Sequence, residues 1–217
     1  MDTLDDSQIA EVLRPYYAED VSGQFCNQVR SYIDLLLRWN RRMSLTTVTD
    51  PLQVLRFHFG ESLFAISQVP IRHGRLADVG SGAGFPAVPI RMALENTRVT
   101  LIESNRKKSA FLSEVTRELR LTNVDVHASR MEDIQDQQRE FDFVTARAVA
   151  IEEPFLRWAS ARLRIAGTVV LWLGQDDSTQ VSLSERFNWR PSIKIPSSDR
   201  RFLLIGTTSP DSPKRST

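Results

Sequence analysis

A glycine-rich turn directly after a short apolar segment is the feature that most constrains how this chain can fold. The segment Leu76-Ala-Asp-Val79 precedes Gly80-Ser-Gly-Ala-Gly84, and Phe85-Pro86 then leads into a helical pattern. A second apolar segment, Val99-Thr-Leu-Ile102, ends in an acidic residue, Glu103. Strand, glycine turn, helix, strand and terminal acid, in this order, indicate a nucleotide pocket at the carboxyl edge of a parallel sheet.

The spacing of the glycines bears on which nucleotide the pocket holds. Asp78 to Gly84 reads D-x-G-x-G-x-G, whereas the dinucleotide fingerprint G-x-G-x-x-G would need glycine in place of Phe85. A pyrophosphate favours N–H donors without a nearby anion, so Asp78 would repel it. The same carboxylate would attract the ammonium and sulfonium groups of S-adenosylmethionine, which is the cofactor we predict.

This prediction gives the residues of the turn separate roles. Gly80, Gly82 and Gly84 let the backbone approach the methionine part of the cofactor closely. Glu103 is placed to accept hydrogen bonds from the two ribose hydroxyls. The alternative is a tight strand–helix turn with Glu103 as a surface charge.

Two further loops are expected at the same edge of the sheet. Met131 and Glu132 follow the third predicted strand, where Met131 can pack on the adenine ring and Glu132 or a nearby backbone N–H can meet its exocyclic amine edge. For Met131 the alternative is an ordinary core position. Arg147 follows the fourth strand and can hold the cofactor carboxylate or an RNA phosphate, and an outward ion pair is the alternative.

From Arg75 onward, short apolar strands alternate with helical patterns. We expect strands at 75–79, 99–103, 124–128, 141–145 and 168–173, and helices at 86–94, 106–119 and 152–163. Residues 189–195 and 201–206 are separated only by Pro196-Ser-Ser-Asp199, which predicts a hairpin and an antiparallel strand. The pattern predicts an α/β fold, the Rossmann-like sheet of class I S-adenosylmethionine-dependent methyltransferases, mostly parallel with an antiparallel C-terminal hairpin strand.

Three helical patterns precede this sheet, at Asp6–Tyr17, at Ser22–Trp39 and from the helix-start signal Asp50-Pro51 onward. We therefore predict an N-terminal helical extension packed on the core (1–74) and a methyltransferase domain (75–207). The remaining residues, 208–217, are rich in Ser, Pro, Lys and Arg and are expected to form a disordered tail.

Charge is distributed unevenly, although the formal net charge of the 217 residues is only +1. A nucleic-acid surface must therefore be a local patch. The densest cationic point combines Arg38, Arg41 and Arg42 with Trp39, and guanidinium and indole planes suit RNA phosphates and unstacked bases. The alternative is a solvated helix end with Trp39 in the core.

Composition excludes several classes of protein. The single cysteine, Cys26, rules out an intrachain disulfide and a multi-cysteine metal site, and the histidines lack metal-ligand spacing. No apolar run approaches the ~20 residues of a membrane span. The acidic start of the chain lacks a signal-peptide pattern. We expect a cytoplasmic monomer with no metal and no membrane partner.

From about Ile33 to Gly206 the chain resembles the bacterial 16S rRNA (guanine-N7) methyltransferases, a family formerly called glucose-inhibited division protein B. The likeness is carried by Trp39-Asn40, Leu45-Thr46, Asp50-Pro51, His58-Phe59, Ser62-Leu63, the Asp78–Pro89 loop, Glu103-Ser104, Lys107-Lys108, Phe111-Leu112, Ser129-Arg130 and Arg147-Ala148. Departures at Ser44, Glu61, Ala87, Leu173 and Gly206-Thr207 make it resemble a divergent member.

The resemblance implies methyl transfer to guanine N7 in the RNA of the small ribosomal subunit, with cofactor contacts at Gly80, Phe85, Met131, Glu132 and Arg147. N7 carries a free lone pair and no proton, so the reaction needs no general base, and positioning at ~3–3.5 Å is the enzyme's task. We expect Arg147 to do this, with His58 and the cluster Arg38, Arg41 and Arg42 holding RNA. A structural role for His58 is the alternative.

Two other functions stay open at this point. One is methyl transfer to a small molecule or a protein, and the other is a cofactor-binding paralogue with little activity.

Overall fold

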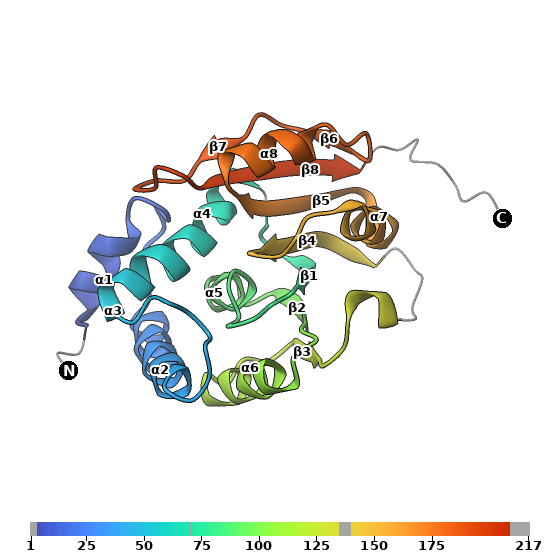
Figure 1. Ribbon diagram of the computed structural model, residues 1–217. Helices are drawn as coiled ribbons and strands as arrows, with labels where there is room; N and C mark the ends of the chain where they lie inside the picture. The colour runs from blue at the N-terminus through green and yellow to red at the C-terminus, as the bar shows by residue number, and fades with distance from the viewer. Residues whose placement is uncertain (1–3, 70, 135–139, 209–217) are drawn as a thin grey trace.

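The computed structural model describes residues 4–69, 71–134 and 140–208. In this part of the chain one sheet has the strand order β3-β2-β1-β4-β5-β8-β6, and β7 also pairs with β8. The strands are β1 (Gly74–Val79), β2 (Thr97–Ile102), β3 (Val124–His127), β4 (Phe141–Arg147), β5 (Leu163–Leu173), β6 (Phe187–Trp189), β7 (Ile193–Lys194) and β8 (Phe202–Thr208). Strands β1 to β5 are parallel, and β8 lies antiparallel beside β5 (Figure 1). The predicted fold class is confirmed.

Helices begin where the sequence supplies capping side chains. The helices are α1 (Asp6–Leu13), α2 (Gly23–Asn40), α3 (Pro51–Val54), α4 (Glu61–Gln68), α5 (Ala87–Ala93), α6 (Arg106–Glu118), α7 (Glu153–Arg162) and α8 (Gln175–Ser182), with a π-helical segment η1 (Leu55–Gly60) and a 3-10 turn η2 (Met131–Asp133). Side chains of Asp5, Ser22, Asp50 and Asn105 accept hydrogen bonds from first-turn N–H groups of α1, α2, α3 and α6. These contacts satisfy donors that a helix start leaves free.

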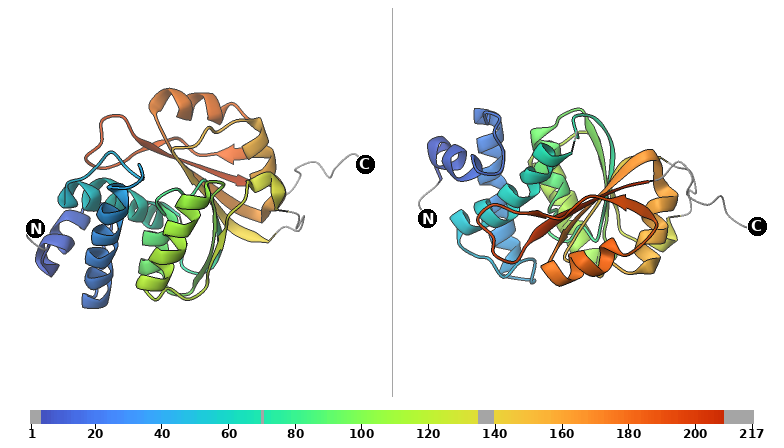
Figure 2. Two further views of the ribbon diagram at one scale, coloured as in Figure 1. Left: turned by 60° about the horizontal axis from the view of Figure 1, so that its bottom comes forward. Right: turned by 90° about the horizontal axis from the view of Figure 1, so that it is seen from above.

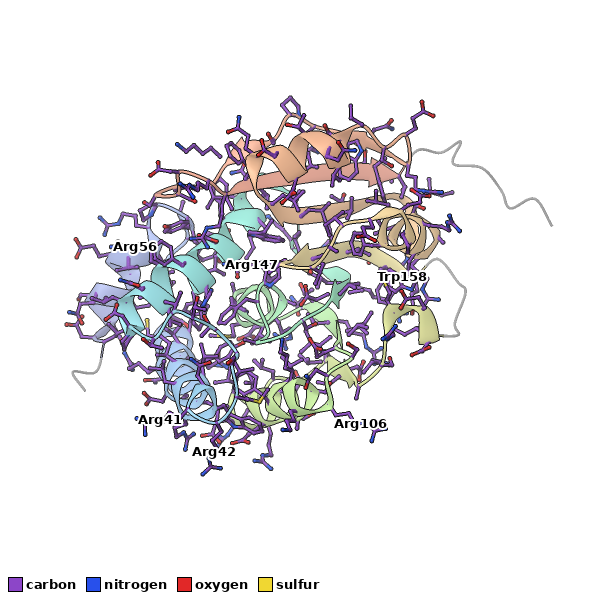
Figure 3. The ribbon with its side chains drawn as sticks, viewed as in Figure 1. Arg41, Arg42, Arg56, Arg106, Arg147 and Trp158 are labelled. Atoms are coloured by element: carbon purple, nitrogen blue, oxygen red, sulfur yellow. The ribbon has the colours of Figure 1, made fainter. Side chains whose placement is uncertain are left out.

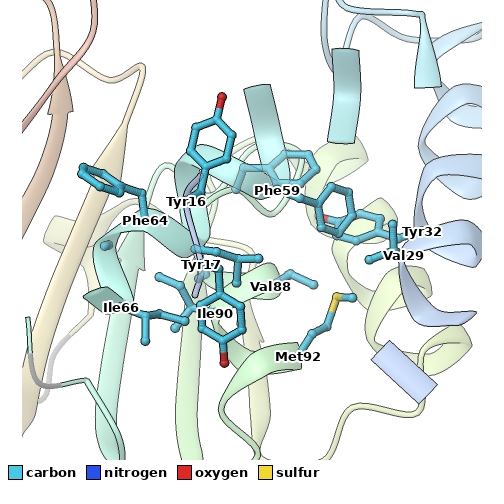
Figure 4. Close-up of a cluster of buried hydrophobic side chains, with 14 of the residues drawn as sticks. Tyr16, Tyr17, Val29, Tyr32, Phe59, Phe64, Ile66, Val88, Ile90 and Met92 are labelled. Atoms are coloured by element: carbon cyan, nitrogen blue, oxygen red, sulfur yellow. The ribbon is translucent and has the colours of Figure 1, made fainter. Parts of the chain in front are cut away.

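Helices cover both faces of the sheet (Figure 2). Alternate residues of β1 face opposite sides, because Leu76 belongs to one apolar cluster and Ala77 and Val79 to another. The Leu76 cluster also contains side chains of α1, α2, α4, α5 and α6, whereas α7 and α8 contribute to the second cluster. The helices before Gly74 therefore share a continuous core with the sheet. Figure 4 shows this core around Val88 and Ile90 of α5.

The glycine turn lies directly against α2. The Tyr32 hydroxyl donates to the Ala83 carbonyl oxygen at 2.5 Å. Gly84 has φ +86°, and a Cβ there would overlap the Tyr32 hydroxyl and lie 2.9 Å from Val88 Cγ2. Glycine is therefore required here both for its backbone conformation and for the close approach of α2.

Several predicted boundaries were wrong, each for a local reason. The strand predicted at 189–195 is two short strands, β6 and β7, that flank Pro191, since proline cannot donate to a ladder. Strand β5 begins at Leu163, before the predicted Thr168. Helix α8 was missed because its sequence, QDDSTQVS, buries only Ser178 and Val181. Of the predicted tail, Thr208 ends β8, and residues 209–217 lie outside the described part.

The helix predicted from Asp50 is divided by the π-helical segment η1. One extra residue per turn changes which side chains face inward, and such segments often occur at functional sites. Here η1 carries His58, and Glu61 follows as the first residue of α4.

We expect Gly84→Ala to destabilise the protein by about 2–4 kcal/mol, because the substitution combines a left-handed φ with overpacking against Tyr32. Urea denaturation measures this. The control is Gly174→Ala, where φ is −69° and the added Cβ would meet Asp177 Oδ2 at an ordinary 3.5 Å. Equal losses in the two variants would contradict the account.

Candidate functional site

A pocket of about 270 Å³ opens at the carboxyl ends of β1 and β2. Three residues of the sequence prediction line it, namely Gly80, Met131 and Glu132. Its wall also includes residues that were not predicted, among them Ser104, Val149, Ala150 and Phe155. The location is that expected for a ligand of an open α/β sheet.

Gly80, the first residue of the turn that follows β1, lines the pocket. The N–H groups of Gly80 and Ser81 both donate to the Ile102 carbonyl oxygen, at 2.8 and 3.1 Å, which ties the turn to the end of β2. Gly80 has φ +69°, and a Cβ there would overlap Val149. A side chain at Gly80 would therefore fill the space beside the pocket wall.

Glu103 closes the same region from the end of β2. Its carboxylate is nearly buried, with an exposed fraction of 7%. One oxygen accepts from Gly82 N at 2.9 Å and the other from Asn105 N at 2.7 Å. A carboxylate has about four acceptor positions, so two remain for further donors. The predicted contact with ribose hydroxyls is compatible with this geometry and stays a prediction.

Asp78 is fully enclosed under the glycine turn. The Thr145 hydroxyl donates to Asp78 Oδ1 at 2.6 Å, whereas Oδ2 is buried and has no hydrogen-bond partner among the described residues. Burial raises the pKa of Asp78 to about 7, the hydrogen bonds from Thr145 and Ser81 oppose the shift, and the charge of Glu103 adds to it. A buried carboxylate with an orphaned oxygen is destabilising unless a cation or donor reaches it.

Arg147 ends β4 and is directed away from solvent (Figure 3). Its Nη2 atom donates to the Phe57 carbonyl oxygen at 2.9 Å and lies 3.0 Å from Glu61 Oε2. Nη1 is buried without a partner, and burial lowers the pKa of Arg147. The alternative was an outward ion pair, whereas the pair that Arg147 forms points inward to the buried Glu61. Contact of Arg147 with the cofactor or with RNA stays a prediction.

Glu61 is the centre of this buried charge cluster. Its side chain is 1% exposed, and its second carboxylate oxygen lies 3.1 Å from Arg201 of the C-terminal hairpin. Burial raises the pKa of Glu61, and the two arginines oppose that shift. One carboxylate thus joins the first residue of α4 to the end of β4 and to the segment that enters β8.

His58 does not present a cationic ring to solvent. Its Nε2 atom lies 2.8 Å from Thr46 Oγ1, and its ring stacks on Phe85 with centroids 4.8 Å apart. Burial, with the charges of Arg147 and Arg201, lowers the pKa of His58 to about 3, so the ring is neutral. Its predicted RNA contact stays a prediction that this packing does not support.

Phe85 packs between the N-terminal helices and the glycine turn. Its ring stacks on Tyr32 with a centroid distance of 5.2 Å and is 7% exposed. A cofactor contact at Phe85, as the resemblance implies, would therefore involve its backbone.

The arginines predicted to bind RNA lie at the end of α2. Arg38, Arg41 and Arg42 are exposed. Trp39 is half-buried, and its indole N–H donates to Glu114 Oε2 at 3.1 Å. The tryptophan is therefore a packing residue, and the arginines remain available to a partner.

Sequence reasoning missed part of the site for two reasons. Val149 and Phe155 follow β4, and the general rule that loops at the carboxyl edge line the pocket would have found them. Glu61 gave no comparable signal, since only the tertiary fold brings it to Arg147.

Comparison with known proteins identifies the family to which the chain belongs. The model of the GidB family, described as rRNA small subunit methyltransferase G, matches residues 25–193. A Ribosomal RNA small subunit methyltransferase G of Chloroflexus aggregans is 33% identical over 87% of this chain and 84% of its own length. The corresponding protein of Alkaliphilus oremlandii is 38% identical over 71% of this chain and 66% of its own length.

The chain belongs to the family of rRNA small subunit methyltransferase G.

Solved structures of lower sequence identity support the fold of this family member. A SAM-dependent methyltransferase from Aquifex aeolicus aligns with a TM-score of 0.62 and 15% identity, over 79% of this chain and 98% of that one. The YcgJ protein of Bacillus subtilis aligns with a TM-score of 0.59 over 70% of this chain and 99% of that one.

The described residues show neither a metal cluster nor a membrane-spanning helix. No group of three or more His, Cys, Asp or Glu side chains there could hold a metal ion. None of the described helices combines the length and hydrophobicity needed to cross a bilayer.

The raised pKa of Asp78 predicts a specific pH dependence. Because the folded-state pKa of about 7 exceeds the ordinary value of 3.8, the native state holds the proton longer, and its stability falls as pH rises between these values. Asp78→Asn removes this loss. The free energy of unfolding of the variant, measured relative to that of the parent, should therefore rise by about a few kcal/mol from pH 4 to pH 8. Urea denaturation at both pH values measures the difference, and a constant difference would contradict the prediction.

Removing the charge of Glu61 should be costly, because two arginines lose their buried counter-charge. We expect Glu61→Gln to lower the free energy of unfolding by about 3 kcal/mol. Glu153→Gln is the matched control. Glu153 also pairs with two arginines, Arg157 and Arg186, but it is 50% exposed, so its loss should stay below about 1 kcal/mol. Similar losses in thermal or urea denaturation would refute the role given to burial.

Proposed function

We propose that this chain transfers a methyl group from S-adenosylmethionine to the N7 atom of a guanine in 16S rRNA of the small ribosomal subunit. Membership of the rRNA small subunit methyltransferase G family supports the reaction class and the cofactor. The observation that carries the proposal in the structure is Asp78, whose buried Oδ2 atom has no partner among the described residues and which directly precedes Val79 and Gly80 of the pocket wall.

The residues present fit such a cofactor. Asp78 would hold its ammonium group, and the backbone around Gly80, Gly82 and Gly84 would pass beside its methionine part. Glu103 retains acceptor positions for the ribose, and Met131 and Glu132 line the end of the pocket where adenine is expected. The bound cofactor supplies the methyl group on a cationic sulfur.

No residue of the chain has to remove a proton. Guanine N7 is unprotonated, so methylation there requires an aligned lone pair at near-attack distance. We assign this positioning to Arg147, whose Nη1 donors are free while Glu61 and Phe57 hold Nη2. The arginines Arg38, Arg41 and Arg42 would bind phosphates of the RNA.

Two of the departures from the family are buried, namely Ala87 at the start of α5 and Leu173 at the end of β5. The competing function is transfer to a different methyl acceptor, or a cofactor-binding paralogue with little activity. We further propose that the protein acts as a cytoplasmic monomer on the small subunit.

Radiolabelled methyl transfer tests the function directly. The substrates are small subunits from cells that lack the native modification, with fully modified subunits as control. We expect label in 16S rRNA at guanine N7 and none in the control. Label on another acceptor would favour the competing methyltransferase function. Cofactor binding without labelling would favour the paralogue.

Binding of S-adenosylhomocysteine tests the pocket independently of activity. We expect Asp78→Asn to weaken binding at least about tenfold, as loss of one buried ionic contact predicts. Isothermal titration calorimetry at pH 8 measures it. Asp142→Asn, in a carboxylate at the start of β4 paired with Arg164, is the control and should bind normally. Equal affinities would contradict the assignment of Asp78.

A further inference from the structure

Two helices that are far apart in the sequence place their cationic ends on the same side of the molecule (Figure 3). Gln28 of α2 donates to the carbonyl oxygen of Leu119, which caps α6, at 2.9 Å. At the other end of α2, the ring of Trp39 packs on Phe111 with centroids 5.6 Å apart. Helices α2 and α6 therefore run antiparallel, and the end of α2 and the start of α6 lie on the same side of the molecule (Figure 3).

Each of these ends carries cations at consecutive positions. Arg41 and Arg42 follow α2, and Arg106, Lys107 and Lys108 begin α6. Four of the five are exposed and Lys108 is half-exposed. Figure 3 shows Arg41, Arg42 and Arg106 extending outward from the same side of the molecule. We call these five residues the basic rim.

The rim is unpaired, unlike many cations elsewhere in the chain. Arg30, Arg75 and Arg164, for example, form ion pairs of 2.5–2.8 Å. Within the described residues, no ion pair involves any member of the basic rim. Its charge is therefore not neutralised by ion pairs within the described part of the chain.

Helix stability does not explain the cations on α6. Its first turn contains no acidic residue, although the positive end of a helix dipole favours anions there. The N–H groups of Lys107 and Lys108 are already bound by the Asn105 side chain, at 3.0 and 3.2 Å. An external anion would have to be bound by the side chains and not by the helix terminus.

The rim adjoins the pocket. Ser104 lines the pocket, and Arg106 begins α6 two residues later. A polyanion held along the rim would therefore pass beside the site where methyl transfer is proposed.

We propose that the basic rim, formed jointly by α2 and α6, is the surface that binds the phosphate backbone of the substrate rRNA. The inference rests on the proposed function for the identity of the RNA and adds α6 to the arginines of α2. Because all five contacts would be to phosphates, the rim orients the RNA without reading its sequence.

The test measures how strongly the parent protein and its variants bind unmodified small subunits at a series of salt concentrations. S-adenosylhomocysteine is present throughout. The variants are Arg41→Gln with Arg42→Gln, and Arg106→Gln with Lys107→Gln. The control, Arg14→Gln with Arg117→Gln, removes the same charge from exposed residues, Arg117 being at the opposite end of α6.

Each rim variant should reduce the slope of log K against log salt by about 0.7–0.9 per lost phosphate contact. For the two contacts that each double variant loses, the change corresponds to roughly 10- to 100-fold weaker binding at 0.1 M salt. The control should keep the parental slope, and all variants should bind S-adenosylhomocysteine normally in calorimetry. A parental slope in the α6 variant, or no binding of subunits by the parent, overturns the proposal.

A crosslink identifies the partner. A photoreactive group is attached to the new thiol of the Lys107→Cys variant. Cys26 does not compete for labelling because it is buried. Crosslinks to 16S rRNA support the proposal, whereas crosslinks only to an acidic ribosomal protein overturn it. If the rim binds rRNA but no methyl label appears there, the proposed function fails and the rim inference survives.

Discussion

The carboxylate of Asp78 is enclosed by the turn that follows β1, and only one of its oxygens has a partner. The two residues that follow Asp78 in sequence, Val79 and Gly80, line the pocket. The glycines remove side chains that would fill the space, as the overlap of a Cβ at Gly80 with Val149 shows. Glu103 adds a second carboxylate nearby, which makes the region attractive to a cation and unfavourable to a phosphate. In the proposed function, a cationic ligand bound at Asp78 would recover the stability that its burial costs the free protein.

A second buried carboxylate, Glu61, holds together three parts of the chain that the sequence separates widely. It joins the N-terminal helices to Arg147 of β4 and to Arg201 of the hairpin. This explains why the N-terminal helices are integral to the site, since they provide the counter-charge that fixes one side of the Arg147 guanidinium. The other side, Nη1, is left without a partner. Removal of Glu61 should therefore affect positioning of Arg147 as well as folding.

The sequence predicted those features that depend on local patterns. The alternation of strands and helices predicted the sheet. The D-x-G-x-G-x-G spacing predicted the turn after β1, and the acid after the second apolar segment predicted Glu103 at the end of β2. Features that depend on tertiary contacts could not be predicted. Trp39 was assigned two alternatives because its partner Glu114 lies far along the chain, and the inward ion pair of Arg147 required knowledge of where Glu61 lies. Helix α8 was missed because it buries little apolar surface, and Pro191 divided a strand that propensity alone would have kept whole.

Titration of the Asp78 carboxyl carbon by NMR, without and with S-adenosylhomocysteine, tests the central claim most directly. The account predicts a pKa near 7 in the free protein and a pKa well below that value in the complex, because the ligand's ammonium group stabilises the ionised carboxylate. An ordinary pKa near 4 in the free protein, or a pKa that the ligand leaves unchanged, would contradict it.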